Sequence, residues 1–249
     1  MLLVINLEDA TERRKRMAMQ LAAQGLAFER IGFDGRRLTQ SELRERIAGD
    51  FPRLTFNHAR LSGAEIGCWV SHLLAWRRLL DSGTAACTVI EDDLLLSDEF
   101  ASVTAALEAS DDGYDLVYLG TSSRNLSTRR SRPLDGAANG ATRLHETIGC
   151  VFNTWGYVVR RPFVERWFAA PQAIRLPIDH ILGGRVTRSK PRLAVVQPAV
   201  VTEEPVLARD SQIEPYTNRL DRARLIEATR RRFLESRAGD FFYRLYRWL

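Results

Sequence analysis

Short apolar runs and longer stretches of helical periodicity take turns along the first half of the chain. The apolar runs are typical of strands and lie at residues 2–7, 28–33, 86–90 and 115–119. Apolar positions at helical spacing occur at residues 11–24, 38–47, 62–80 and 97–109. Because strands joined by helices form parallel sheets, this order predicts an α/β fold with a mostly parallel central sheet flanked by helices.

The predicted helices carry signals for their ends. Thr11 or Asp9 is placed to cap helix 11–24, and Gly25 is placed to end it. Before the third helix, Ser62 and Glu65 stand at the spacing of a capping box. The apolar residues of that helix share one face: Ile66, Trp69, Val70, Leu73, Trp76 and Leu80. This face is therefore predicted to belong to the core.

The second half of the chain begins with a stretch that lacks these patterns. Residues 121–147 are poor in large apolar side chains and rich in Ser, Arg, Gly and Asn, which predicts a long loop. Beyond it, we expect an apolar segment at 151–159, a helix at 162–168, a short element at 177–182 and a strand at 193–196.

Composition indicates the class of protein. A chain of 249 residues, 45% hydrophobic and 27% charged, can bury a core of its own. Cys68, Cys87 and Cys150 are odd in number and far apart, which fits neither a disulfide framework nor a zinc site and indicates a reducing compartment. The first apolar run is too short for a signal peptide, and no run approaches the roughly eighteen residues of a membrane span, so we expect a cytoplasmic protein.

The net charge is concentrated at one end of the sequence. Residues 217–249 contain nine arginines and four acidic residues, and 9 − 4 = +5 is the formal net charge of the whole chain. We expect a catalytic domain at 1–216 and a basic amphipathic helical segment at 217–249. This segment would lie on an anionic membrane or pack its aromatic side chains on the domain, and the two interpretations are compatible.

Polar residues stand where the predicted strands end. Asn6, Asp34 and Gly120 follow three of these strands, and an acidic triplet at 91–93 follows another. Ligands of a parallel sheet bind beyond the C-terminal ends of its strands, so we expect these residues to meet in one crevice, although the pattern does not give the strand order. For Asp34, a plain β-turn with Gly35 is the alternative.

The acidic triplet, Glu91-Asp92-Asp93, interrupts an otherwise apolar run. Two unit charges about 4 Å apart repel by roughly 4 kcal/mol at an effective dielectric constant near 20, so the cluster needs compensation. A hard divalent cation such as Mg²⁺ or Mn²⁺ provides it, and usually takes its other ligands from water and substrate phosphates. Simple exposure to water at the start of a loop is the alternative.

Two further stripes of helix 62–80 carry small or polar residues. Gly67 and Ser71 lie four residues apart, where the missing side chain lets a strand or a ligand approach closely. Cys68 and His72 form another stripe with Glu65, and a histidine in this setting is more often a hydrogen-bonded structural residue than a base.

Arginines gather in the predicted loop, at positions Arg124, Arg129, Arg130 and Arg132. They would bind a donor diphosphate or an anionic acceptor, or else form a solvated charged loop. No recognised nucleic-acid-binding motif accompanies them, which argues against a nucleic acid as partner.

The order of several motifs resembles glycosyltransferase family 25, which includes enzymes that extend bacterial lipooligosaccharide and the collagen galactosyltransferases. The strongest motifs are VINLEDATERRKRM at 4–17, FERIGFDG at 28–35, LSGAEIGCWVSHLLAW at 61–76 and VIEDD at 89–93. Weaker ones are DLVYLG, TWGYVVRR, PIDHIL and SQI, and the resemblance spans about residues 3–213.

This resemblance implies a GT-A-type, Rossmann-like domain that uses Mn²⁺ or Mg²⁺ and a UDP-sugar, with galactose as the leading sugar. Carried onto this sequence, Asp93 is the direct metal ligand. Glu91 and Asp92 contact the donor ribose, the donor sugar or metal-bound water, and Glu91 is also counted among the metal ligands. Asn6 and Asp34 hold the nucleoside. The acceptor would be a saccharide or a glycolipid.

Inversion at the anomeric carbon is also implied, so one side chain should accept the proton of the acceptor hydroxyl. Asp179 is our first candidate for this base, and an N-cap of a short helix beginning at His180 is its alternative. His180 would complete the metal sphere through a ring nitrogen or face solvent. Gly156 would let the backbone approach the donor sugar or relieve crowding in a strand.

The sequence thus predicts a metal-dependent, inverting glycosyltransferase that builds lipopolysaccharide, lipooligosaccharide or another glycoconjugate, peripherally attached to the inner face of a membrane. Two other classes stay open. A metal-dependent phosphohydrolase also uses clustered acids at strand ends, and a non-catalytic nucleotide-binding module would bind the nucleotide without turnover.

Overall fold

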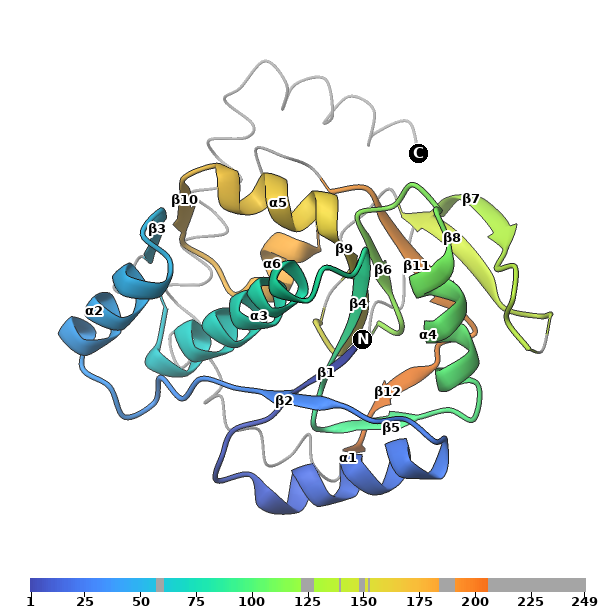
Figure 1. Cartoon of the computed structure of the whole chain (residues 1–249), viewed down its shortest axis with the longest axis horizontal. Coiled ribbons are helices and arrows are strands. Elements are labelled where there is room, and N and C mark those ends of the chain that lie inside the picture. Colours follow the sequence, from blue (N-terminus) through green and yellow to red (C-terminus); the bar gives the residue numbers. More distant parts are fainter. Residues whose placement is uncertain are drawn as a thin grey trace, which may run out of the picture. The chain divides into compact units, whose positions relative to one another are not determined.

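The structure is a computed structural model that describes residues 1–56, 61–121, 128–138, 140–147, 151, 153–183 and 191–205 (Figure 1). These residues belong to one unit of the chain, Met1–Ser211. Cys150, Arg124 and the predicted basic segment 217–249 lie outside the described residues. The boundary expected at residue 216 therefore stays a prediction.

An eight-stranded sheet forms the centre of this unit, in the order β2-β1-β4-β9-β6-β11-β8-β7. The strands are β1 (Leu2–Ile5), β2 (Glu29–Ile31), β4 (Ala86–Glu91), β6 (Leu116–Tyr118), β7 (Thr128–Pro133), β8 (Arg143–Thr147), β9 (Gly156–Arg160) and β11 (Leu193–Gln197). Six of them run in one direction, whereas β8 and β9 run the opposite way. The predicted α/β fold with a mostly parallel sheet is confirmed.

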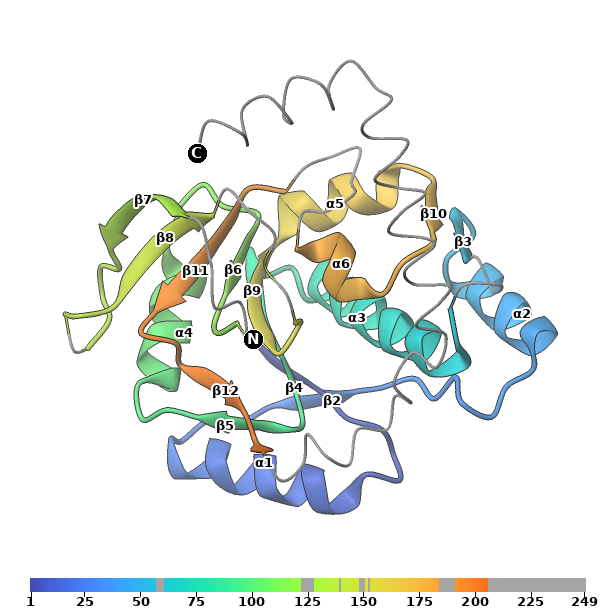
Figure 2. The ribbon, with the colours of Figure 1, turned by 180° about the vertical axis from the view of Figure 1, so that it is seen from behind.

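Helices cover both faces of the sheet, as the two views show (Figures 1 and 2). They are α1 (Thr11–Ala23), α2 (Gln40–Asp50), α3 (Gly63–Ser82), α4 (Phe100–Ala109), α5 (Arg161–Ala169) and α6 (Ile178–Leu182). Neighbouring strand residues serve opposite faces: Leu3 packs in the cluster that contains α2, α3, α5 and α6, and Val4 packs in the cluster of α1 and α4. Burial on both faces explains why the strands read as continuous apolar runs.

Two predictions of local structure are wrong. The N-cap of α1 is Ala10, without a side-chain hydrogen bond, so neither Thr11 nor Asp9 caps the helix. The expected loop at 121–147 contains the antiparallel hairpin of β7 and β8. Strand β7 is exposed along its length and β8 buries only Leu144, so neither carries the alternation that marks a half-buried strand.

Four more strands, each of three residues, were not predicted. They form two separate pairs, β3 (Leu54–Phe56) with β10 (Gln172–Ile174) and β5 (Leu94–Leu96) with β12 (Val201–Glu203). Two predictions from local signals hold: Ser62 and Glu65 form both hydrogen bonds of the capping box, and Gly25 has the positive φ of +67° expected after α1.

Helix α3 packs tightly against the turn that follows β2. A Cβ atom on Gly67 would lie 2.8 Å from the Gly35 nitrogen and 2.9 Å from the Phe33 oxygen. The Ser71 hydroxyl accepts a hydrogen bond from the Phe33 N–H at 2.9 Å and donates one to the Gly67 carbonyl, also at 2.9 Å. Gly67 and Ser71 therefore hold residues 33–35 on the helix.

Gly67→Ala should destabilise the protein, because its new methyl group meets backbone atoms that cannot rotate away. Overpacking of this kind costs about 1–3 kcal/mol, and in a chain of this size each kcal/mol lowers Tm by about 2–4 °C. Gly49→Ala in α2 is the matched control, since nothing lies within 4 Å of that Cβ position, and alanine favours a helix. Equal Tm values for the two variants in thermal unfolding would contradict this tight contact.

Candidate functional site

The C-terminal ends of β1, β2, β4 and β6 share one edge of the sheet, and β9 begins at that edge because it runs the opposite way. The strand register places Ile5 beside Glu91 and Ile90 beside Gly156. Asn6, the acidic triplet and residues 154–156 therefore meet. Among the described residues, Asp34 and Gly120 make no hydrogen bond to the triplet, so their share in the expected crevice stays a prediction.

Glu91 is held by contacts with residues 154–155 and with His72. Its N–H donates to the Trp155 carbonyl at 2.8 Å, and its Oε1 accepts a hydrogen bond from the Thr154 hydroxyl at 2.6 Å. His72 Nε2 lies 3.5 Å from the same oxygen. Burial raises the pKa of the Glu91 carboxyl, but the His72 and Thr154 contacts outweigh it and the pKa is lowered overall.

Asp92 takes its support from β1 and α1. The Asn6 amide donates to Asp92 Oδ2 at 2.6 Å and to the Ala10 carbonyl at 2.9 Å. Arg13 Nη1 lies 3.5 Å from Asp92 Oδ1. Burial is the main cause that raises the pKa of Asp92, with Asn6 and Arg13 acting against it. Asn6 thus orients a carboxylate, and its contact with a nucleoside stays a prediction.

Asp93 is the least satisfied member of the triplet. Its Oδ1 is buried and has no hydrogen-bond partner among the described residues. Its Oδ2 lies 3.7 Å from Arg13 Nη1. Burial, followed by the charges of Glu91 and Asp92, raises the pKa of Asp93 to about 7. The backbone is fixed, since the Glu204 N–H donates to the Asp93 carbonyl at 2.9 Å.

Cys68 and His72 lie beside Glu91, and the three residues form a cluster of metal-ligand type. The ligand atoms of Cys68, His72 and Glu91 lie within 4.8 Å of one another. Burial raises the pKa of the Cys68 thiol well above its usual range, and the charges of Glu91, Asp179 and Asp93 raise it further. A protonated thiol is a poor ligand for Mg²⁺ or Mn²⁺, which prefer oxygen. This trio therefore does not fit the hard cation expected at the triplet.

Asp34 is occupied by a local turn. Its Oδ1 accepts from the Arg36 N–H and Nε–H at 2.9 Å each, and its Oδ2 pairs with Arg36 Nη2 at 2.7 Å. Arg36 also bridges to Asp9 at 2.7 Å. The hydrogen bond from Arg36 is the main cause that lowers the pKa of Asp34. The turn interpretation accounts for these contacts, and a nucleoside contact stays a prediction.

Asp179 and His180 lie in α6, which begins at Ile178, so Asp179 is not the N-cap of a helix beginning at His180. Asp179 Oδ1 accepts the His180 N–H at 2.9 Å. Its side chain is 31% exposed, and its charge adds to the raised pKa of the half-buried Cys68 thiol and of the Tyr118 hydroxyl. Asp179 therefore lies near Cys68, as Glu91 and Asp93 do. The roles of base and metal ligand stay predictions.

The glycine at position 156 sits inside the sheet. A Cβ there would lie 3.0 Å from Ile90 Cγ2, with Leu119 and Val201 side chains at 3.5 and 3.6 Å. These contacts support the interpretation that Gly156 relieves crowding in the strand. Gly120 is equally enclosed, because Val201 lies against it.

Three arginines of the stretch that was expected to be a loop lie on the exposed strand β7. Arg129 pairs with Glu146 at 2.6 Å, and Arg132 donates to the Asp112 carbonyl at 3.2 Å. Binding of a diphosphate or an anionic acceptor by Arg129, Arg130 and Arg132 stays a prediction.

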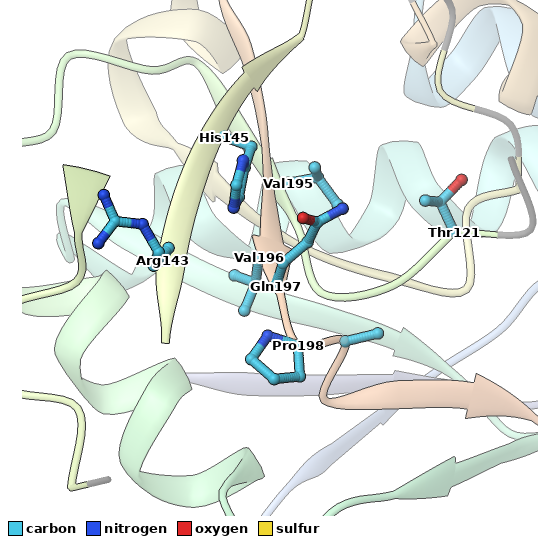
Figure 3. A pocket seen from close by; sticks show the side chains of 8 residues that line it. Thr121, Arg143, His145, Val195, Val196, Gln197 and Pro198 are labelled. Atoms are coloured by element: carbon cyan, nitrogen blue, oxygen red, sulfur yellow. The ribbon is translucent and has the colours of Figure 1, made fainter. Parts of the chain in front are cut away.

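A separate pocket of about 580 Å³ lies along β8 and β11 and reaches Thr121, which follows β6 (Figure 3). Arg143, His145 and residues 195–199 complete its lining. Arg143 Nε donates to the Ser131 hydroxyl at 2.7 Å. Burial, with the charge of Arg143, lowers the pKa of His145.

Two residues that contact the triplet were not predicted. Arg13 contacts both Asp92 and Asp93, and Thr154 holds Glu91. Both lie in motifs of the family resemblance, Arg13 in VINLEDATERRKRM and Thr154 in TWGYVVRR. Their contacts with the triplet could not be predicted, because each residue meets it from an element distant in sequence. Arg13 belongs to the basic run of α1, and such a run usually forms a solvated helix face.

Comparisons with known proteins agree with the motifs at this edge. A family model described as glycosyltransferase family 25 (LPS biosynthesis protein) matches residues 1–182. A lacto-N-neotetraose biosynthesis glycosyltransferase of Neisseria meningitidis is 27% identical over 99% of this chain and 89% of its own length. A protein of the same description from Neisseria gonorrhoeae is 30% identical over 73% of this chain and 66% of its own.

An animal relative extends the range of acceptors. Procollagen galactosyltransferase 1 of Danio rerio is 26% identical over 72% of this chain, which corresponds to 30% of that protein. All three relatives are transferases of sugar residues by description. The family model covers most of the chain, including helix α3 and the acidic triplet. The chain therefore belongs to glycosyltransferase family 25.

Proposed function

We propose that this protein is a metal-dependent, inverting glycosyltransferase with a GT-A-type fold, which moves a hexose from a UDP-sugar to a saccharide or glycolipid acceptor. Family membership supports the transferase class over the phosphohydrolase and the non-catalytic nucleotide-binding module. Asp93 carries the proposal of metal dependence: its Oδ1 is buried without a partner among the described residues, in a cluster of three carboxylates. Mn²⁺ or Mg²⁺ is the expected ion.

The residues at the triplet fit a hard cation. Asp93 offers an unpaired carboxylate oxygen, whereas Thr154 and Asn6 already hold Glu91 and Asp92 in place. A bound divalent cation supplies positive charge to the diphosphate leaving group of the donor. Glu91 and Asp92 would then be free to orient the donor, and His180 is our candidate for a further ligand.

Asp179 is our candidate for the general base. It is partly exposed, unlike the buried Ser71 and His72, and it lies near enough to affect the Cys68 thiol behind the triplet. A carboxylate there would accept the proton of the acceptor hydroxyl as the new glycosidic bond forms.

Galactose is the favoured sugar, because one relative is described as a galactosyltransferase. The Neisseria relatives and the family description favour an acceptor in lipopolysaccharide or lipooligosaccharide synthesis. Among the described residues, no helix is long and apolar enough to cross a membrane. We propose that the basic segment 217–249 places the enzyme on the anionic inner face.

Asp93→Asn should abolish metal-dependent transfer. Loss of several kcal/mol of charge stabilisation lowers the rate of UDP release from UDP-galactose at least a hundredfold. Excess EDTA should do the same to the wild type. In a thermal-shift assay, UDP with Mn²⁺ should raise Tm of the wild type but not of the variant. Asp98→Asn, at an exposed aspartate nearby in sequence, is the control, and full activity of Asp93→Asn would reject the metal role.

Asp179→Asn should separate chemistry from donor binding. Removing a general base typically lowers kcat by about 10²–10⁴-fold, while the thermal shift with UDP and Mn²⁺ should match the wild type. Glu165→Gln, at an exposed position of α5, controls for the loss of a surface charge. A kcat within a few-fold of the wild type would show that another group takes the proton.

Arg230→Gln, Arg231→Gln and Arg232→Gln together should weaken binding to anionic vesicles. Each basic residue near such a surface contributes about 1 kcal/mol, so removing three lowers the affinity more than tenfold. Co-sedimentation with phosphatidylglycerol vesicles measures this, and neutral phosphatidylcholine vesicles are the control. Equal binding by the triple variant and the wild type would exclude the segment as the anchor.

A further inference from the structure

A buried tyrosine lies directly behind the histidine that faces Glu91. His72 in α3 and Tyr157 in β9 both have no exposed surface. His72 Nδ1 lies 2.8 Å from the Tyr157 hydroxyl, and the two rings stack with centroids 5.7 Å apart. Trp76 Nε1 lies 3.0 Å from the same hydroxyl. Two buried ring nitrogens thus meet at one buried hydroxyl oxygen.

One arrangement of protons at this junction gives the Tyr157 hydroxyl both a donor and an acceptor. An indole N–H only donates, so Tyr157 Oη accepts from Trp76. The tyrosine then has one proton to give, and His72 Nδ1 is the acceptor that the described residues offer it. Burial raises the pKa of Tyr157 well above its usual range, so the hydroxyl keeps its proton. His72 Nδ1 is therefore unprotonated and Nε2 carries the hydrogen.

This tautomer suits Glu91. His72 Nε2 is buried and makes no hydrogen bond within the described part of the chain. It lies 3.5 Å from Glu91 Oε1, an electrostatic contact in which a proton attracts the carboxylate and a lone pair would repel it. The same oxygen accepts the Thr154 hydroxyl. Oε2 has no hydrogen bond within the described part of the chain, and the Glu91 side chain is 25% exposed. Oε1 is thus held by its contacts, while Oε2 stays open.

A soft metal ion at Cys68, His72 and Glu91 is the competing explanation for this cluster. It would need an unprotonated Nε2 and a thiolate. The proposed tautomer opposes the first, because its Nε2 carries the hydrogen. The hydrogen-bond arrangement explains the same distances without an ion.

We propose that His72 is a positioning residue: Tyr157 fixes its imidazole as the Nε2–H tautomer, and this N–H holds the Glu91 carboxylate in the orientation that serves the donor. The second half of this statement rests on the proposed function. The first half concerns the free protein alone.

Nitrogen-15 NMR of the histidine rings tests the tautomer in the full chain without donor or metal. The wild type should show a neutral His72 ring with the proton on Nε2, and His72→Gln identifies the signal. A proton on Nδ1, a doubly protonated ring, or a metal-bound Nε2 with zinc retained after purification would each overturn the proposal. The result does not depend on activity, so absence of transfer with every donor would contradict only the proposed function.

Kinetics test the positioning role with two neighbouring buried tyrosines. Tyr157→Phe should move the His72 proton toward a mixed state and lower kcat about tenfold or more, the usual effect of removing a supporting contact. Tyr118→Phe is the matched control, because its ring lies 6.3 Å from that of Tyr157 and its hydroxyl is buried without a partner among the described residues. It should change neither the tautomer nor kcat.

The conservative variant separates positioning from folding. His72→Ala should lower kcat about 10–100-fold, whereas His72→Gln, whose amide can still donate to Glu91, should recover most of it. Thermal unfolding should show similar Tm losses for both. If Gln is as impaired as Ala at equal stability, or if the two tyrosine variants lose kcat equally, the positioning role is rejected.

Discussion

Repulsion among three adjacent carboxylates at the end of β4 is the constraint on which the rest of this site depends. Glu91, Asp92 and Asp93 follow a strand that is buried on both faces, so water screens them less than it would on a surface. The sheet order answers this constraint. Because β1 and β9 flank β4, Asn6 reaches Asp92 from one side and Thr154 reaches Glu91 from the other.

Helix α3 links this site to the core through its separate stripes. One stripe is buried in the aromatic cluster with α5, a second presses Gly67 on the turn after β2, and a third carries His72 toward Glu91. Interiors are close-packed, so a rigid helix in tight contact on two sides fixes what its third side presents. The core therefore sets the position of a residue in the site, and stability and function are coupled there.

Features with local signals could be predicted from the sequence, and features made by distant contacts could not. The capping box at Ser62, the apolar strand runs and the gathering of strand ends follow from periodicity and turn chemistry. The insertion of antiparallel β9 between β4 and β6 leaves no local trace, because strand order depends on long-range packing. Arg13 and Thr154 were missed for the same reason, and the hairpin of β7 and β8 because its strands bury little.

The charge balance at the triplet explains why its three carboxylates differ in how well they are paired. Because the pKa of Asp93 is raised to about 7, this carboxyl is only partly ionised at neutral pH. With all three carboxylates ionised, the triplet carries −3 and Arg13 contributes +1, which leaves −2. One divalent cation would cancel this charge, whereas a monovalent ion would leave half of it. An aspartate with a buried, unpartnered oxygen and a pKa raised to about 7 costs folding stability. An asparagine would remove that cost, so binding a cation is a physical reason to carry the third acid.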